Sequence, residues 1–192
     1  MPTVSPSFVG LVVSVEITKT ATAALDDSEI SELENIVAQS YGVDSDDLTI
    51  ETEYVTSGII TVDIADSISD EEALTSLTTA IATALGVSEE SITLTLDPES
   101  GEVSYTVTTN DFDDTAAILA SLQSDDIIDT LVTDVVEIQD VTPSDEIVAE
   151  VNVVVDADDV TVPLQQAENQ VDALLGKDYD VNTESNETFR NK

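Results

Sequence analysis

The sequence contains no cysteine, no histidine and no tryptophan. The absence of cysteine excludes disulfides and thiolate metal sites. Without histidine or cysteine, a nucleophilic serine would need lysine as its base, and the only lysines are Lys19, Lys177 and Lys192. The six glycines form neither a GxGxxG nor a GxxxxGK phosphate loop. We therefore identify no catalytic and no cofactor-binding residue, and we expect a protein that is not an enzyme.

Positive charge is almost missing. The chain has 42 Asp and Glu residues against 4 Lys and Arg, a net charge of -38, and no cation lies between Thr20 and Gly176. Most carboxylates must therefore be solvated and mutually repelling, so we expect added salt to raise the melting temperature. The sign of the charge excludes direct phosphate-mediated binding of nucleic acid. We expect partners to be proteins with basic surfaces.

Long apolar runs are also missing. No stretch is long enough to span a membrane, and residues 1–10 carry neither a basic nor a long apolar segment. The sequence therefore predicts no transmembrane segment and no secretory signal. Hydrophobic residues still make up 41% of the chain while aromatic residues make up 4%, so we expect a folded protein with an aliphatic core.

Apolar residues alternate between strand and helix spacing along the chain. Alternation predicts a strand at 11–17, and helical spacing predicts a helix at about 27–41 that ends at Gly42. Further strands are expected at about 48–55, 60–64, 92–96, 103–107, 135–138, 147–155 and 179–181, and further helices at about 69–85, 113–132 and 163–175. The dipeptide Ser57-Gly58 and the run Asp97–Gly101 predict turns, and Thr142-Pro143-Ser144 predicts a linker.

The chain contains an internal repeat. The segment from Leu33 to Ile50 aligns without a gap on the segment from Leu77 to Leu94, at an offset of 44 residues, and each copy has a glycine after its helix. Four strand–helix–strand units in series predict an α+β protein with two βαββαβ domains, antiparallel sheets and helices on one face.

The boundary between the two domains can be placed in two ways. The simplest partition is 1–98 and 102–184, with 185–192 as a polar tail. An alternative takes 57–139 as a central domain that the outer units close. The tight turn at Pro98 favours strand pairing across the first boundary, so the sequence leaves both partitions open.

Calcium is the one ligand that the sequence suggests, because hard cations prefer clustered carboxylates. Each Asp cluster lies at a helix start or a strand end, where aspartate also caps helices, so a structural role is the alternative. The candidate ligands are Asp44, Asp46, Asp47, Asp156, Asp158 and Asp159, with a further cluster at Asp111, Asp113 and Asp114. The first cluster resembles the start of an EF-hand loop but lacks the glycine and the closing glutamate.

The segment from Leu77 to Thr108, LTTAIATALGVSEESITLTLDPESGEVSYTVT, carries a helix–Gly-Val–strand module. It resembles tandem ferredoxin-like repeats in acidic proteins of marine algae and of their large DNA viruses. The resemblance covers most of the chain and implies no site residues. It implies tandem ferredoxin-like domains and a structural or protein-interaction role as a minor capsid or cement-type virion protein, in the virion or the host cytoplasm. The alternative function is an acidic calcium-binding or mineral-associated protein.

Overall fold

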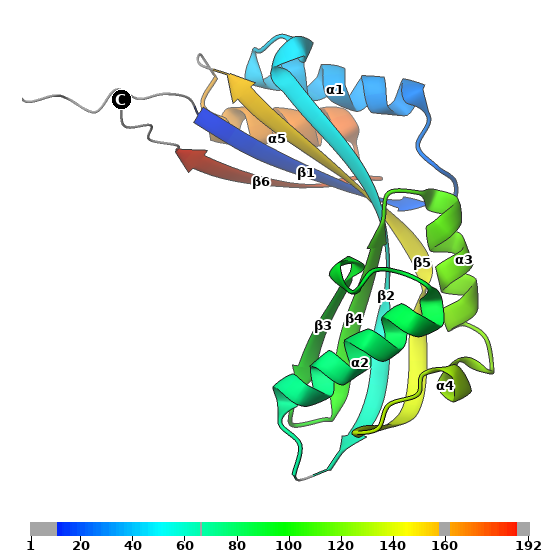
Figure 1. Ribbon diagram of the computed structural model, residues 1–192. Helices are drawn as coiled ribbons and strands as arrows, with labels where there is room; N and C mark the ends of the chain where they lie inside the picture. Colours follow the sequence, from blue (N-terminus) through cyan, green and yellow to red (C-terminus); the bar gives the residue numbers. More distant parts are fainter. Residues whose placement is uncertain (1–10, 66, 158–161, 188–192) are drawn as a thin grey trace, which may run out of the picture. The chain divides into compact units, whose positions relative to one another are not determined.

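The computed structural model describes residues 11–65, 67–157 and 162–187 (Figure 1). The protein is α+β, with a six-stranded antiparallel sheet in the order β3-β4-β2-β5-β1-β6. In chain order the elements are β1 (Leu11–Ala21), α1 (Asp27–Tyr41), η1 (Ser45–Asp47), β2 (Leu48–Ile64), α2 (Asp70–Leu85), η2 (Glu89–Ser91), β3 (Ile92–Asp97), β4 (Glu102–Thr109), α3 (Phe112–Leu122), α4 (Ile127–Thr130), β5 (Val136–Ala157), α5 (Leu164–Leu175) and β6 (Asp180–Glu187).

The chain divides into two compact units. Unit 1 takes residues 1–20, 25–52 and 149–192, and unit 2 takes residues 21–24 and 53–148. Strands β2 and β5 each contribute residues to both units, so the strand order is β2-β5-β1-β6 in unit 1 and β3-β4-β2-β5 in unit 2.

This division differs from the partition into 1–98 and 102–184. Residues 98–101 form the turn of the β3–β4 hairpin, whose two strands pair within unit 2. The alternative central segment, 57–139, lies entirely inside unit 2.

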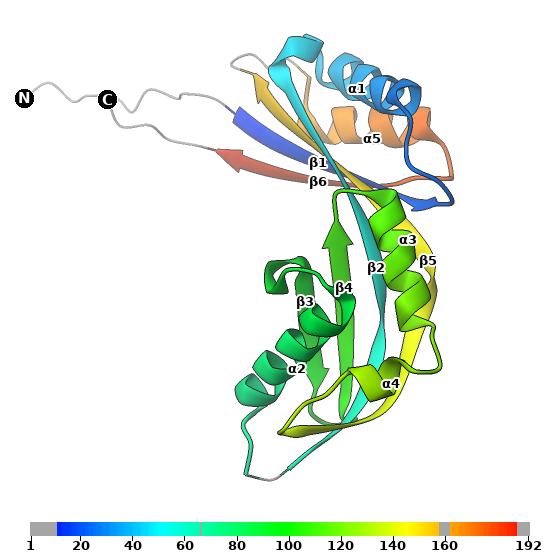
Figure 2. The same cartoon turned by 45° about the vertical axis from the view of Figure 1, so that its right-hand side comes forward.

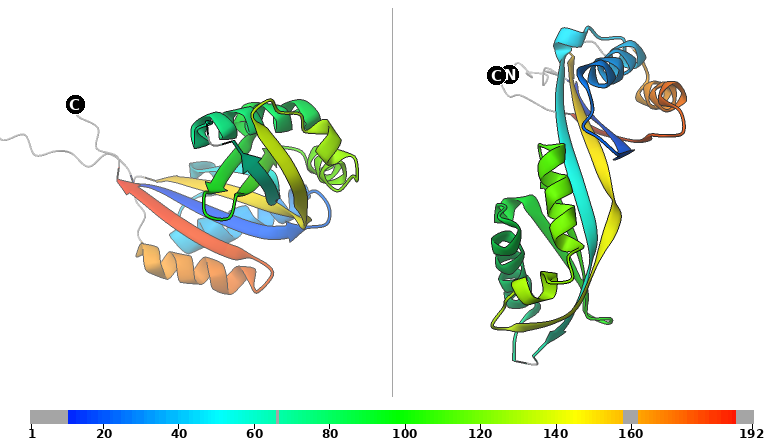
Figure 3. Two further views of the ribbon diagram at one scale, coloured as in Figure 1. Left: turned by 90° about the horizontal axis from the view of Figure 1, so that it is seen from below. Right: turned by 90° about the vertical axis from the view of Figure 1, so that its right-hand side faces the viewer.

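Unit 1 is built on strongly alternating strands. In β1, Val13, Val15 and Ile17 are at most 1% exposed, whereas the residues between them are half-buried or exposed. Helices α1 and α5 are in contact and lie side by side in the right-hand view of Figure 3. Helix α1 begins with a capping box, in which the Asp26 carboxylate accepts from the backbone N–H groups of residues 28 and 29.

Unit 2 has its own core. Helices α2, α3 and α4 lie on one face of its strands (Figure 2). Ile81 of α2, Val107 of β4 and Leu122 of α3 are at most 1% exposed and belong to one buried cluster. Gly86 ends α2 in the left-handed conformation, with φ 71°, as Gly42 ends α1. The repeat seen in the sequence is therefore a repeat of helix, left-handed cap and following strand.

The turn predicted at Ser57-Gly58 is wrong. Both residues lie inside β2, which runs without interruption from Leu48 to Ile64. Gly58 is not in the left-handed region that a tight turn would need. Glycine suits this position for a different reason, because a side chain there would collide with Tyr105, as described below.

The linker predicted at Thr142-Pro143-Ser144 is also wrong, because these residues lie inside β5. Every backbone N–H of an inner strand donates to one of its two neighbouring strands, and proline has no N–H to donate. Within unit 2, however, β5 is the outermost strand, next to β2 alone. Pro143 can therefore occupy a strand there without breaking a ladder on its open side.

One predicted helix and the start of the predicted C-terminal tail differ from the expectations. The helix predicted over 113–132 is two helices, because α3 ends at Leu122 and the polar residues that follow separate it from α4. The expected polar tail begins later than residue 185, because β6 pairs with β1 as far as Glu187. None of the helices within the described residues is long and apolar enough to cross a membrane.

Candidate protein-interaction surface

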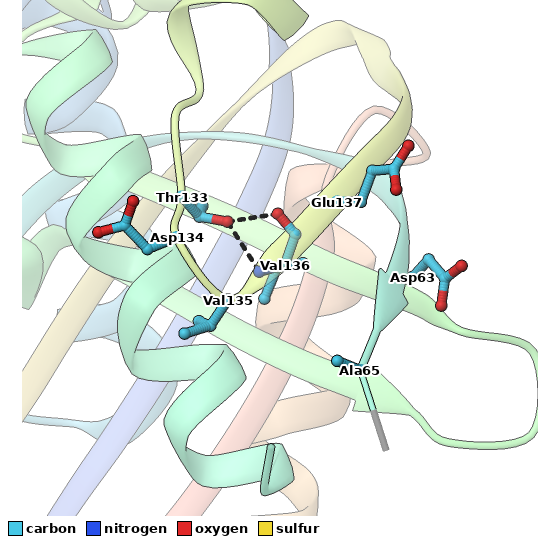
Figure 4. A pocket seen from close by; sticks show the side chains of 7 residues that line it. All are labelled: Asp63, Ala65, Thr133, Asp134, Val135, Val136 and Glu137. Atoms are coloured by element: carbon cyan, nitrogen blue, oxygen red, sulfur yellow. Dashed lines mark hydrogen bonds between the residues drawn. The ribbon is translucent and has the colours of Figure 1, made fainter. Parts of the chain in front are cut away.

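Among the described residues, unit 2 carries open pockets of about 470, 430 and 390 Å³. The first holds the carboxylates of Asp63, Asp134 and Glu137. In Figure 4 the Asp134 side chain points away from the other two. The Thr133 hydroxyl is used internally, since it donates to the Val136 carbonyl and accepts from the Val136 N–H. The three carboxylates of this pocket therefore do not converge on one point.

Strand β3 stands at one end of the strand order, and within residues 11–65, 67–157 and 162–187 it pairs with β4 alone. The side chains of Ile92, Leu94 and Leu96 are buried or half-buried, while those of Thr93 and Thr95 are exposed. In an antiparallel strand, every second residue directs both its N–H and its C=O to the same side. The side of β3 away from β4 is thus a row of backbone groups that can pair with another strand.

Two central rows of the exposed sheet face beside this edge carry no charged residue. The registers place Thr93 beside Thr106 and Ser57 in one row, and Thr95 beside Ser104 and Ile59 in the next. All six side chains are exposed or half-buried. We call this set the hydroxyl face, consisting of Ser57, Ile59, Thr93, Thr95, Ser104 and Thr106. A face without carboxylates is unusual on a chain with a net charge of -38.

Carboxylates bound the β3 edge at both ends. Before the strand, Glu89 and Glu90 lie in η2, and the Glu89 carboxylate accepts from the Thr79 hydroxyl at 2.8 Å. After it, Asp97 is paired with Glu102 across the hairpin. Between Glu90 and Asp97, the six residues from Ser91 to Leu96 are uncharged. Along the edge, the charge pattern is therefore acidic, neutral, acidic.

The hairpin turn that closes this edge is held firmly. The Asp97 carboxylate accepts from the Glu99 N–H at 2.9 Å, and this hydrogen bond lowers the pKa of Asp97 below its ordinary value. Gly101 has φ 72°, and its carbonyl accepts from the Val62 N–H of β2 at 3.0 Å. The position of the carboxylates at this end is thus set by the backbone of the turn.

A pocket of about 390 Å³ lies at the other end of β3. Its lining includes two carboxylates, Glu53 of β2 and Glu90 of η2, together with the hydroxyl residues Ser88, Ser91 and Thr108. It holds no basic side chain. A lysine or arginine side chain of a partner would find carboxylate and hydroxyl oxygens there as hydrogen-bond acceptors.

The opposite edge of the strand order is different. Strand β6 pairs with β1 alone and carries Asp180, Glu184 and Glu187 along its length. Charged residues on an edge strand discourage pairing with another chain. The two edges therefore differ in the feature that controls strand addition.

The calcium candidates are only partly described. Asp44, Asp46 and Asp47 are exposed around η1, and Asp44 makes no side-chain cap bond. Asp158 and Asp159, and the side chain of Asp156, lie outside the described residues. The third cluster has a structural use, because the Asp111 carboxylate caps α3. Among the side chains that the structure describes, no group of three carboxylates is arranged to hold a metal ion.

Two of the four basic residues can be located. Lys19 donates to the Glu29 carboxylate at 2.9 Å and to the Tyr179 hydroxyl at 3.4 Å. The hydrogen bond to Glu29 raises the pKa of Lys19, and the same bond lowers the pKa of Glu29. Lys177 is exposed, and Arg190 and Lys192 lie outside the described residues. Lys19, one of the lysines that could serve as the base for a nucleophilic serine, is thus paired with a carboxylate.

The sequence reading missed the hydroxyl face. The alternation of Thr93 and Thr95 with Ile92, Leu94 and Leu96 does predict that the two threonines point outward. The rows across three strands depend on the registers of β2, β3 and β4. The sequence predicts a turn at Ser57-Gly58, so it does not predict that Ser57 and Ile59 lie in a strand beside β4.

Comparison of the chain with protein-family models, with curated proteins and with solved structures finds no match. The resemblance to acidic repeat proteins of marine algae and their viruses therefore stays a prediction.

Proposed function

We propose that this chain is a non-enzymatic structural or protein-interaction component that binds a partner with a basic surface. The observation that carries the proposal is the hydroxyl face, an uncharged patch beside an open strand edge on a strongly acidic chain. Like charges on a surface repel acidic neighbours, whereas an uncharged patch surrounded by carboxylates favours docking of a cationic protein. The hydroxyl face is therefore the contact surface, and the surrounding carboxylates attract and orient the partner.

We propose further that the two units are ferredoxin-like domains, with unit 2 inserted in sequence between two strands of unit 1. The order of elements supports this, since each unit runs strand, helix, strand, strand, helix, strand. The strand orders β6-β1-β5-β2 and β5-β2-β4-β3 also follow one pattern: in each unit the last strand is at an edge, next to the first. In this proposal the two units are a scaffold, and the function depends on the loops and strand edges that they present to a partner.

Within this function, the role that we propose is a minor capsid or cement-type protein of a virion. The resemblance of the segment 77–108 to acidic repeat proteins of algae and their large DNA viruses supports that role. Its location would be the virion or the cytoplasm of the infected cell. The measurement is mass spectrometry of purified particles, in which the chain should appear at a fixed stoichiometry; recovery of the chain only as a free monomer would contradict the virion role.

The general function is tested with charge placed on the hydroxyl face. The double variant Thr95→Lys with Ser104→Lys should abolish capture of the basic partner by the purified protein, because it places positive charge against a cationic surface. The matched control is Gln166→Lys with Gln170→Lys, which adds the same charge at exposed positions of α5. If both variants capture the partner equally, the hydroxyl face is not the contact surface.

A further inference from the structure

We propose that β3 accepts an added strand from the partner. The inference rests on the proposed function and specifies its contact. The added segment is extended, has an uncharged centre of β-forming residues as long as β3, and carries lysine or arginine at both ends. The hydroxyl face then continues from β4 and β3 onto the partner's strand.

The edge of β3 is open to pairing in a way that edge strands usually are not. Natural edges are protected by charged side chains, by proline or by bulges. From Ser91 to Leu96 there is no charged residue and no proline, and the register with β4 runs without a bulge. Strand β6, at the other end of the strand order, carries three acidic residues. The missing protection is therefore specific to β3.

The chemistry of the centre follows from the exposed side chains. A residue of the added strand opposite Thr93 or Thr95 would lie on the same face as that threonine, at about 5 Å. Pairs of threonine with threonine, serine or valine are favourable in antiparallel sheets. Glutamate or aspartate at those positions would add repulsion. The centre of the partner segment is thus composed of uncharged, mainly β-branched residues.

The charges at the ends of the segment follow from the carboxylates that bound β3. One end lies beside η2, which contains Glu89 and Glu90 and adjoins the pocket that Glu53 also lines, and the other end lies beside Asp97. The acidic, neutral, acidic pattern reads the same in both directions. A basic, neutral, basic segment would therefore match β3 whether it adds parallel or antiparallel.

A second copy of this chain does not fit the same edge. If two β3 strands paired antiparallel, Asp97 of one copy would face the Glu89–Glu90 end of the other. Like charges that face each other across a strand pair are destabilising. Each copy also brings a net charge of -38. The occupant is for these reasons a cationic partner.

The experiment uses the full chain and a synthetic peptide with an alternating Val/Thr centre as long as β3 and lysines at both ends. Calorimetry at physiological salt should show stoichiometric binding, and hydrogen exchange should slow at alternate amides of β3. A second peptide has the same charge but a proline in the centre. It should bind about tenfold more weakly, because proline removes a ladder hydrogen bond and interrupts the strand.

Protein variants test the η2 end of the edge. Glu89→Gln with Glu90→Gln should weaken binding of the lysine peptide and make it less dependent on salt. The matched control, Asp125→Asn with Asp129→Asn, removes the same charge at exposed positions near α4 and should bind as the unmodified protein does. Asp97 is left unchanged because its carboxylate holds the turn.

The outcomes separate the two proposals. Equal binding of both peptides with no protection of β3 overturns strand addition and leaves the general attraction for basic proteins standing. Absence of binding for every cationic peptide counts against the proposed function itself. Concentration-dependent dimerisation of the protein alone, with β3 amides protected in the dimer, would assign the edge to a second copy and overturn the inference.

Discussion

Gly58 of β2 and Tyr105 of β4 are directly opposite each other, and the Tyr105 hydroxyl fills the space beside the glycine. A Cβ atom on residue 58 would lie 2.5 Å from that hydroxyl oxygen and 2.6 Å from the Thr142 carbonyl oxygen of β5. Covering of a strand glycine by a cross-strand aromatic ring is a known way to fix register. The glycine therefore sets the pairing of β2 with β4, on which the rows of the hydroxyl face depend.

The first prediction concerns this contact. Gly58→Ala should lower the free energy of unfolding by about 2–3 kcal/mol, because the methyl group meets a backbone oxygen that cannot move freely. Gly86→Ala is the matched control, since its Cβ would meet nothing within 4 Å and only the left-handed φ is strained. Its cost should be about 1 kcal/mol. Chemical denaturation measures both, and an equal cost for the two variants would show that the contact with Tyr105 is relaxed in solution.

The second prediction concerns alkaline pH. Tyr105 is 1% exposed, and burial raises its pKa from 10.0 to about 12. Between these values the unfolded chain has lost the phenol proton and the folded chain keeps it, so stability falls as pH rises. Its hydroxyl has no hydrogen-bond partner among the described residues. Tyr105→Phe should therefore be close to neutral at pH 7.

The measurement is denaturant unfolding of both proteins across that pH window. Tyr105→Phe should lose less stability than the unmodified chain between pH 10 and 12. Parallel losses in the two proteins would mean that the phenol is already accessible to water in the folded state.

The third prediction concerns salt. With 42 acidic and 4 basic residues, repulsion among carboxylates destabilises the compact state. Sodium chloride screens this repulsion, so the melting temperature should rise steadily from low to molar concentration. Sorbitol at matched osmolality is the control for effects that do not depend on charge. A melting temperature that is constant across the salt series would show that the carboxylates are too well separated or solvated to matter.

The fourth prediction concerns calcium. Because Asp44, Asp46 and Asp47 are exposed and form no metal-binding group, calcium should stabilise the chain only by diffuse attraction. Replacing all three with asparagine should then reduce calcium stabilisation no more than replacing Asp125, Asp129 and Asp134. Calorimetry decides the matter. A stoichiometric heat of calcium binding that only the first triple variant removes would establish a site and favour the alternative, calcium-binding function.

Local patterns predicted much of this fold. The helices that end at Gly42 and Gly86 and the hairpin around Pro98 are confirmed, because each depends on residues close together in sequence. Two of the differences, at Gly58 and Pro143, have a similar cause. Glycine and proline usually mark turns, but here a distant tyrosine and an open strand side accommodate them within strands. Such tertiary compensation is not visible in a local pattern.

The candidate surface was predictable only in part. The sequence shows that Thr93 and Thr95 point outward and that residues 91–96 carry no charge. It does not show that β3 is an edge strand, because strand order depends on how β2 and β5 are shared. The rows with Ser57 and Ser104 required the register of three strands. The charge pattern was local information, whereas its position in the sheet was not.

The shared strands have a consequence for the order of events on the ribosome. Unit 2 is essentially one continuous stretch of chain, 53–148, whereas unit 1 needs partners from before residue 52 and after residue 149. During synthesis β1 and α1 emerge first, yet their neighbours β5, α5 and β6 are made last. Unit 2 can therefore complete its fold before unit 1 can fold, because the C-terminal part of unit 1 has not yet been synthesised. Folding of unit 2 orders the chain that links the two sequence parts of unit 1. Less conformational entropy is then lost when these two parts pair.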